Sequence, residues 1–176
     1  MTFETLHSEN IYHGKAFDVR KDQVRLPDGN IAHLDIVDHQ PAITLLPMDD
    51  KGSIWFVRQY RYPAQHYLLE LPAGAIEAGE TPEDCAHREV REEIGMAAEN
   101  LEKIGEFFLA PGYSTEYMHV FKATGLNPAP LQGDADEFLT VERFSLDEVM
   151  QMVADGRIRD SKSLAALFLS HLIPSA

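Results

Sequence analysis

Short segments in which apolar and polar residues alternate make up the first part of the chain. Residues 17–26 and 31–37 alternate in this way, and Pro-Asp-Gly-Asn at 27–30 lies between them. Alternation with a period of two is typical of half-buried strands, and this tetrapeptide is typical of a turn. The pattern therefore predicts an antiparallel hairpin. Two apolar runs, 42–48 and 54–60, are separated by a polar turn and predict a second hairpin.

A different periodicity marks the centre of the chain. Ala86, Val90 and Ile94 recur every four residues, which places them on one face of a helix. Thr81 is suited to the N-cap of this helix, and Gly95 is suited to its C-terminal end. The sequence therefore predicts one central helix bounded by these two residues.

The second half of the chain adds further strands and two helices. Ser-Leu-Asp-Glu at 145–148 is a capping box that opens a helix ending before Gly156. In a last helix we expect Leu164, Leu167 and Phe168 to face inward. Strands are expected at 68–71, 104–109, 118–123 and 138–144, and the last helix at 161–173. Strands around a central helix, followed by terminal helices, indicate a mixed-sheet α/β fold of the α+β type.

Length and charge limit the classes of function. The chain has 176 residues and a net charge of −14, from 29 acidic against 15 basic side chains. The length suits one domain of usual size, which we divide into an antiparallel β sub-region at 1–41 and a main domain at 42–176. A nucleic-acid-binding protein normally carries basic residues that neutralise phosphates, so the acidic excess disfavours that class.

Cysteine usage and hydropathy indicate the compartment. Cys85 is the single cysteine, so neither an intramolecular disulfide nor a cysteine metal cluster can form, and a reducing compartment is expected. No apolar run approaches the roughly 18 residues of a membrane span. The N-terminal residues also lack the basic and apolar regions of a signal peptide. We therefore expect a cytoplasmic protein with no nucleic-acid and no membrane partner.

Three glutamates share one face of the central helix. Glu89, Glu92 and Glu93 stand at positions i, i+3 and i+4, and like charges at this spacing destabilise a helix by about 0.2–0.5 kcal/mol per pair unless compensated. Neighbouring arginines or a hard divalent cation would compensate them. A solvated acidic face has the same spacing. However, an apolar stretch at 71–76 precedes the helix, and its Gly74 allows close approach of a ligand or another backbone.

The same segment carries a motif. Gly74, five residues, Glu80, seven residues and the run 88–96, Arg-Glu-Val-Arg-Glu-Glu-Ile-Gly-Met, match GX5EX7REUXEEXGU at every defined position, where U is a bulky aliphatic residue. This pattern is the Nudix box, so the chain resembles Nudix hydrolases. The resemblance implies an α/β/α sandwich and an enzyme that hydrolyses a nucleoside diphosphate linked to another group.

The resemblance also implies which residues bind metal. Helix carboxylates and a backbone carbonyl of the preceding loop match the ligands of related enzymes, and an oxygen-only site favours Mg²⁺, with Mn²⁺ as a substitute. The implied metal ligands are Ala73, Glu89, Glu92 and Glu93. Glu92 is assigned to catalysis as well, whereas Glu80 and Arg88 resemble a structural pair that pins the loop to the helix. Cys85 is expected to pack rather than to react.

Further stretches resemble the ADP-ribose pyrophosphatase branch of the family. Ala-Pro-Gly at 110–112 is similar to the Ser-Pro-Gly signature of that branch, although Ala110 departs from it. Arg-Gln-Tyr-Arg at 58–61 also matches, and a planar, permanently charged guanidinium suits a substrate phosphate. In this branch the N-terminal region contributes to adenine binding across a dimer. The implied substrate-binding residues are Phe17, Arg58, Arg61, Glu70 and Pro111.

The general base of the resembling branch lies on an acidic loop downstream. Here that loop is 132–137, and alignment on the following strand places Glu137 at the catalytic position. Asp136 and Glu142 are the alternatives. A solvated acidic turn is a simpler interpretation of the same residues.

The function implied by the resemblance is Mg²⁺-dependent hydrolysis of ADP-ribose or a related nucleoside diphosphate sugar, giving AMP (or another nucleoside monophosphate) and a sugar phosphate. A Nudix hydrolase of GDP-mannose or of a dinucleoside polyphosphate is an alternative. A non-catalytic nucleotide-sugar sensor is a third, and the complete set of glutamates argues against it. We expect a homodimer built through residues 1–41, because a lone two-stranded hairpin is marginally stable.

Overall fold

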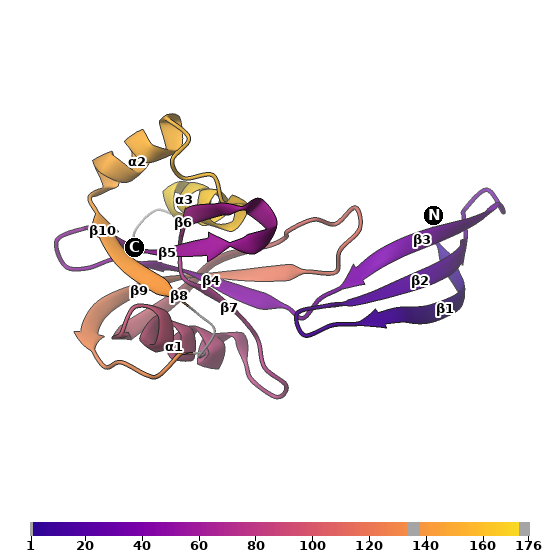
Figure 1. The fold of residues 1–176 in the computed structure, drawn as a ribbon, viewed down its shortest axis with the longest axis horizontal. Coiled ribbons are helices and arrows are strands. Elements are labelled where there is room, and N and C mark those ends of the chain that lie inside the picture. The colour runs from indigo at the N-terminus through magenta and orange to yellow at the C-terminus, as the bar shows by residue number, and fades with distance from the viewer. Residues whose placement is uncertain (1, 134–137, 173–176) are drawn as a thin grey trace. The chain divides into compact units, whose positions relative to one another are not determined.

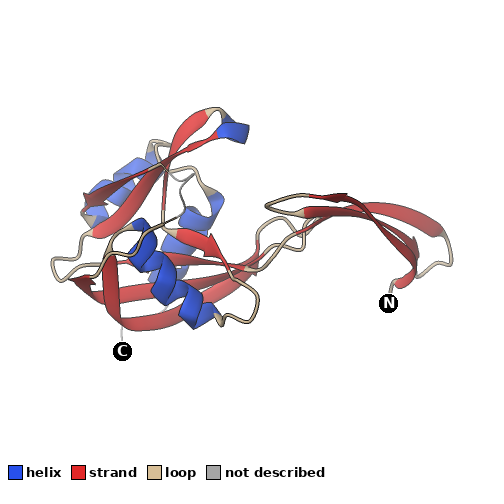
Figure 2. Ribbon diagram, turned by 60° about the horizontal axis from the view of Figure 1, so that its bottom comes forward, coloured by secondary structure: helices blue, strands red, loops and turns tan. Residues whose placement is uncertain are grey.

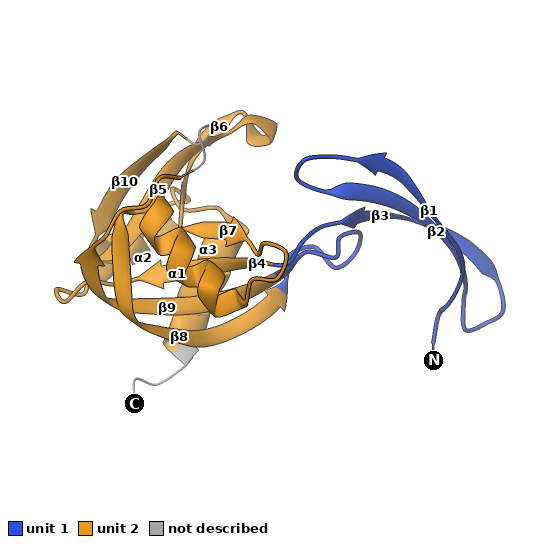
Figure 3. Cartoon of the chain, turned by 90° about the horizontal axis from the view of Figure 1, so that it is seen from below, with its two compact units in different colours: residues 1–41, 108–117 blue, residues 42–107, 118–176 orange. Residues whose placement is uncertain are grey.

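The computed structural model describes residues 2–133 and 138–172. The chain divides into two compact units, which are coloured separately in Figure 3. Unit 1 comprises Met1–Pro41 and Phe108–Tyr117, and unit 2 comprises Ala42–Phe107 and Met118–Ala176. The second segment of unit 1 is the connection between two long strands of unit 2.

Unit 1 is built on a three-stranded antiparallel sheet in the order β1-β2-β3 (Figure 1). Strands β2 (Asp18–Arg25) and β3 (Ile31–Asp38) form the predicted hairpin, with Gly29 at a φ of 89° in the turn. Strand β1 (Glu4–His13) pairs with β2 and was not predicted. Every residue of β1 is exposed, so the strand lacks the alternation of buried and exposed positions by which a strand is identified in a sequence.

Unit 2 contains two sheets among its described residues. The first has the order β7-β4-β9-β8, and β4 pairs in parallel with β9 and antiparallel with β7. The second has the order β10-β5-β6 and is antiparallel. The predicted second hairpin of 42–48 with 54–60 is therefore wrong, since β4 and β5 lie in different sheets and an isolated bridge between Met48 and Ile54 joins them. The strands are β4 (Ala42–Pro47), β5 (Ile54–Arg61), β6 (His66–Glu70), β7 (Ala73–Ala75), β8 (Met96–Phe108), β9 (Tyr117–Pro128) and β10 (Leu139–Phe144). A short 3-10 turn, η1 (Tyr62–Ala64), joins β5 to β6.

Helices cover the strands of unit 2 from two sides, as Figures 1 and 2 show. Helix α1 (Pro82–Glu93) packs against Ile43 and Leu45, whereas α2 (Leu146–Ala154) and α3 (Ser161–Leu172) share a cluster with Leu46. Successive residues of a strand point to opposite faces of its sheet, so β4 serves both helical layers. The α/β/α sandwich with a mixed sheet is thereby confirmed.

The predicted ends of two helices are confirmed by their caps. The hydroxyl of Thr81 accepts a hydrogen bond from the backbone N–H of Asp84, and Gly95 follows α1 with a φ of 70°. At the start of α2, Ser145 and Glu148 form both hydrogen bonds of a capping box. These caps depend on neighbours in the sequence, which is why the sequence predicts them.

Helix α3 differs from its prediction at one position. Leu167 is buried and Leu164 packs against the core, but Phe168 is 65% exposed, and Ala166 is buried in its place. The inward face of α3 is therefore rotated relative to the predicted one. No helix in the described ranges is long and apolar enough to cross a membrane.

Candidate active site

Helix α1 directs two carboxylates onto the short strand β7. Oε2 of Glu93 accepts a hydrogen bond from the backbone N–H of Ala73 at 3.0 Å. A Cβ atom on Gly74 would lie 1.8 Å from Oε1 of Glu89, so the carboxylate of Glu89 occupies space that any other residue at 74 would fill. Both glutamates are buried. Because they stand four residues apart on one helical face, both reach the same stretch of backbone.

Arg88 joins the other acidic groups of this helix. Its Nε and Nη2 donate to the two carboxylate oxygens of Glu80 at 2.9 and 3.0 Å, which confirms the predicted structural pair. Its Nη1 donates to Glu89 at 2.5 Å and to Glu92 at 2.9 Å. The hydrogen bonds from Arg88 hold the pKa of Glu80 below its ordinary value. One guanidinium thus compensates part of the repulsion that the sequence predicted among these glutamates.

The oxygen atoms around β7 fit a hard divalent cation by their chemistry. Buried carboxylates are stable only when cations or hydrogen bonds compensate them, and Glu89 and Glu93 bring two of them to one backbone segment. Within 2–133 and 138–172, no three His, Cys, Asp or Glu side chains are already gathered as a metal site. The carboxylate of Glu92 accepts a hydrogen bond from Arg88, which also donates to the carbonyl of Ala75 in β7.

Cys85 is the one soft ligand of α1, and it is fully buried. Burial raises the pKa of its thiol far above the ordinary value, so the thiolate that would react or bind metal is not formed near neutral pH. Its predicted packing role is confirmed. The donors near β7 are therefore oxygen atoms, which favour Mg²⁺-like or Mn²⁺-like ions over zinc.

The two candidate arginines of β5 lie on opposite faces of their sheet. Val57 packs in the cluster that contains α1, and Phe56 packs in the cluster that contains α2 and α3. By the same alternation Arg61 falls on the α1 side and Arg58 on the α2–α3 side. Nε and Nη2 of Arg61 donate to the carboxylate of Glu70 at 2.9 and 2.7 Å.

Arg61 is electrostatically linked to one glutamate of α1, Glu93. Its hydrogen bonds to Glu70 raise the pKa of its guanidinium above the ordinary value against the opposing effect of burial, and the charges of Glu70, Glu93 and Asp160 raise it further. The field of Glu93 therefore reaches Arg61. Glu70 itself is fully buried and is bound by Arg61. Its predicted role in substrate binding stays a prediction.

Arg58 has another environment. It donates to Glu142 from Nε at 2.5 Å and from Nη2 at 3.3 Å. Both side chains line a cavity of about 440 Å³ together with Met152 of α2 and Arg157 and Arg159, which follow it. The structure brings neither Arg58 nor Glu142 into contact with the glutamates of α1.

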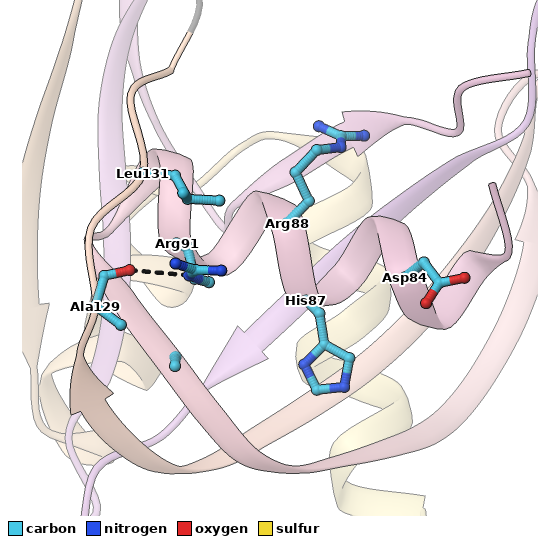
Figure 4. A pocket seen from close by; sticks show the side chains of 7 residues that line it. Asp84, His87, Arg88, Arg91, Ala129 and Leu131 are labelled. Atoms are coloured by element: carbon cyan, nitrogen blue, oxygen red, sulfur yellow. Dashed lines mark hydrogen bonds between the residues drawn. The ribbon is translucent and has the colours of Figure 1, made fainter.

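The chain leading to the acidic loop is fastened to the C-terminal end of α1 (Figure 4). Nε of Arg91 donates to the carbonyl of Ala129 at 3.0 Å, and the backbone N–H of Leu131 donates to the carbonyl of Arg91 at 3.1 Å. A pocket of about 410 Å³ lies beside these contacts. The predicted base Glu137 and its alternative Asp136 lie outside the described residues.

The remaining candidates, Phe17 and Pro111, belong to unit 1. Phe17 is 42% exposed, and its ring lies 6.5 Å from that of Tyr12, tilted by 51°. Pro111 lies in the connection between β8 and β9 and is exposed. Their roles in substrate binding stay predictions.

The sequence did not reveal a group of residues at the start of α3. Lys162 donates a hydrogen bond to the carboxylate of Glu70 and forms an ion pair with Asp160 at 3.0 Å. Ser163 accepts a hydrogen bond from the backbone N–H of Leu71 at 2.8 Å. No local pattern signals the contacts of Lys162 with Glu70 and of Ser163 with Leu71, because each joins residues 92 positions apart in the sequence.

Comparison with known proteins agrees with this geometry. The NUDIX domain model matches residues 38–167, and the nucleoside diphosphate sugar hydrolase N-terminal domain model matches residues 3–33. The chain is 36% identical over 166 residues to an ADP-ribose pyrophosphatase of Bacillus subtilis, covering 93% of this chain and 90% of the relative. It is 38% identical over 176 residues to an ADP-ribose pyrophosphatase of Mycobacterium tuberculosis, covering 97% and 84%. A solved structure described as an ADP compounds hydrolase superposes with a TM-score of 0.88 at 25% identity, covering 98% of this chain and 94% of the other.

Proposed function

The chain belongs to the Nudix family, and we propose that it hydrolyses the diphosphate bond of ADP-ribose or a closely related nucleoside diphosphate sugar. Water adds across the P–O–P linkage, one P–O bond breaks, and a nucleoside monophosphate and a sugar phosphate leave. Relatives named ADP-ribose pyrophosphatase that align with nearly the whole chain support this substrate class. The observation that carries the proposal is the convergence of Glu89 and Glu93 on the backbone of 73–74.

Nudix hydrolases work with a divalent metal ion, and we propose Mg²⁺ as the natural one, with Mn²⁺ as a substitute. Glu89, Glu93 and the backbone of Ala73 would hold the ion, with Glu92 completing the acidic set. A bound divalent cation neutralises negative charge that develops on a diphosphate and lowers the pKa of the attacking water. Arg61 would receive the substrate phosphates, since its Nη1 group is not used by Glu70.

The direct test is hydrolysis of ADP-ribose by the purified full-length chain. A coupled phosphatase releases inorganic phosphate from the two products but not from intact ADP-ribose. We expect release with Mg²⁺ and none after chelation. A chain that binds ADP-ribose but releases no phosphate with Mg²⁺ or Mn²⁺ would be a sensor rather than an enzyme, and GDP-mannose tested in parallel measures the preference between sugars.

The general base is proposed to be Glu137, on the resemblance alone. A general base contributes typically about 10²–10⁴-fold to the rate, so Glu137→Gln should lower kcat by that factor and leave the apparent Mg²⁺ affinity unchanged. A loss below about threefold would move the role to Asp136, to Glu142 or to the carboxylates of α1. Glu142→Gln, on the other face of the sheet, is measured beside it to decide between them.

Unit 1 is proposed to form a homodimer interface. Of its described residues only Asp22 and Val24 are buried, and its sheet exposes large apolar side chains on β1 and β3. An isolated small sheet with no packed face is marginally stable, and a second copy would cover these side chains. The exposed residues include Phe3, Ile11, Tyr12, Phe17, Ile31 and Leu34. A monomeric mass by light scattering at micromolar concentration, with full activity, would contradict this proposal.

We also infer that the enzyme works in the cytoplasm. Cys85 is a free, buried thiol, which is compatible with a reducing compartment. Fractionation of the native cells, followed by detection of the chain in each fraction, tests this location.

A further inference from the structure

A buried carboxylate near the site is held by cations from two different elements. Glu70, at the end of β6, is 1% exposed. Arg61 reaches it from the end of β5 with two hydrogen bonds, and Lys162 reaches it from the first turn of α3. Desolvating a carboxylate costs several kcal/mol unless charged partners compensate it, so each cation contributes to the stability of this arrangement.

Lys162 is largely buried between two carboxylates. Its side chain is 12% exposed and lies between Glu70 and Asp160, whose side chain is 14% exposed. A lysine ammonium has three donors, and two acidic partners already engage it. Arg61 is the reverse case, because its side chain is 42% exposed and Glu70 uses only its Nε and Nη2 groups. Among the described hydrogen bonds none uses the Nη1 group of Arg61, which is therefore assigned to an anion.

The same turn of α3 also fixes the backbone that follows Glu70. Asp160 accepts hydrogen bonds from the backbone N–H and the hydroxyl of Ser163, at 3.0 and 2.6 Å. The hydroxyl of Ser163 in turn accepts a hydrogen bond from the backbone N–H of Leu71 at 2.8 Å. Only Pro72 separates Leu71 from Ala73, whose N–H is bound by Glu93. The first turn of α3 therefore anchors both Arg61 and the backbone of the candidate metal site.

We propose that Lys162 is a positioning residue for Arg61: it holds the carboxylate of Glu70 from the α3 side and thereby keeps the guanidinium of Arg61 oriented toward the diphosphate of the substrate. Lys162 does not touch the substrate itself. This inference rests on the proposed function, in which Arg61 binds the substrate phosphates. Without Lys162, Glu70 would have Arg61 as its sole cationic partner among the described contacts, and more of the charge of Arg61 would be neutralised within the protein.

The test compares Lys162→Met and Lys162→Gln, which remove the charge, with Lys162→Arg, which keeps it. Lys103→Met is the matched control, since Lys103 on β8 also pairs with a glutamate but its side chain is 42% exposed. A charge-assisted hydrogen bond to phosphate is worth about a factor of ten or more. We therefore expect both neutral variants to raise the KM for ADP-ribose by about tenfold, to lower kcat by less than about threefold, and to leave the apparent Mg²⁺ affinity unchanged. Lys162→Arg should restore KM to within about threefold, and Lys103→Met should match the wild type.

A spectroscopic readout separates positioning from mere stabilisation. The Nε–H of Arg61 donates to Glu70, so its ¹H–¹⁵N signal, identified by its loss in Arg61→Met, reports that contact without metal or nucleotide. We expect the signal to shift or to broaden by exchange with water in both neutral variants and to return in Lys162→Arg. An unchanged signal and an unchanged KM, with only a lowered Tm, would show a structural role and overturn the proposal.

A double-mutant cycle gives the third arm. If Lys162 acts through Arg61, Lys162→Gln should change KM by less than about twofold in an Arg61→Met background. If the increases in KM caused by Lys162→Gln and Arg61→Met multiply in the double variant, Lys162 acts independently of Arg61. That result would also overturn the proposal. Lys162→Gln keeps a donor toward Glu70, so it serves where Lys162→Met fails to fold. If the wild type does not hydrolyse ADP-ribose, the proposed function fails, whereas the signal of Arg61 still decides whether Lys162 orients it.

Discussion

Arg58 and Arg61 come from the same strand, and each donates two hydrogen bonds to a glutamate. The two arginine side chains are equally exposed, at 42%. Their partners differ, since the side chain of Glu142 is 27% exposed and that of Glu70 is 2% exposed. Glu70 also has a second cation, Lys162. Two pairs of identical composition are therefore expected to have different roles because of the elements packed around them.

The strand explains the difference in orientation. Alternation along β5 sends Arg61 toward the layer of α1, where Glu93 influences it, and sends Arg58 toward α2, where it borders the 440 Å³ cavity. Exposed ion pairs contribute about 0–1 kcal/mol to stability, whereas removing one partner of a buried pair costs about 3–5 kcal/mol. The α1 side should therefore be sensitive to substitution in both activity and stability, and the α2 side should tolerate it.

The largest expected contrast is in metal-dependent activity. Glu93→Gln and Glu89→Gln should each lower kcat/KM by at least about 100-fold, because each removes an anionic ligand. Even the loss of a residue that only hydrogen-bonds to a metal ligand lowers metal affinity or activity by about 10- to 100-fold. Both variants should stay folded without metal, since like-charge repulsion on α1 is relieved. Calorimetric titration with Mg²⁺ and activity at increasing Mg²⁺ measure the loss. Glu142→Gln is the control, and equal Mg²⁺ affinity in all three variants would exclude Glu89 and Glu93 as ligands.

The next contrast separates the two arginines directly. Arg61→Met should raise the KM for ADP-ribose by about 10- to 100-fold, because a charge-assisted hydrogen bond to phosphate is lost. Arg58→Met should stay within about threefold of the wild type, since its partner is Glu142 on the opposite face. Steady-state kinetics at saturating Mg²⁺ give both values. An increase in KM for Arg58→Met as large as that for Arg61→Met would contradict the assignment of different roles to the two arginines.

A smaller contrast concerns stability. Glu70→Gln should lower the free energy of unfolding by about 3 kcal/mol or more, because Arg61 and Lys162 then face each other without their shared anion. Glu142→Gln should lower it by no more than about 1 kcal/mol. Urea unfolding followed by the fluorescence of Trp55 provides both values. Similar losses in the two variants would mean that the burial of Glu70 has no energetic consequence.

The smallest effect is the pH dependence of that stability difference. Burial by itself would raise the pKa of Glu70, but the hydrogen bonds of Arg61 and the charge of Lys162 outweigh it and lower the pKa. The ionised carboxylate therefore stabilises the folded protein, and this stabilisation is complete above the ordinary glutamate pKa of about 4.3. It is lost as the pH falls through the lower pKa that Glu70 has in the folded protein. The advantage of the wild type over Glu70→Gln should shrink below about pH 4. A constant advantage down to about pH 3 would contradict the ionised pair.

The sequence by itself determined the elements whose signals are local. The ends of α1 follow from Thr81 and Gly95, and the pairing of β2 with β3 follows from alternation and a turn. The glutamates of α1 were predicted to share a face because helical spacing is a property of consecutive residues. A close approach at Gly74 was also predicted, but of a ligand or another backbone, whereas the structure places Oε1 of Glu89 there.

Tertiary structure alone decided which side of β5 faces the site. Alternation along the strand predicts that Arg58 and Arg61 point to opposite faces of the sheet. Only the packing of α1 and α2 shows which of the two lies on the side of Glu93. Packing also left β1 exposed along its whole length and rotated α3 so that Phe168 faces outward. The contact of Lys162 with Glu70 spans 92 positions of sequence. Such contacts depend on how whole elements dock, and the free energy of docking comes from buried surfaces distributed over the chain rather than from any short pattern.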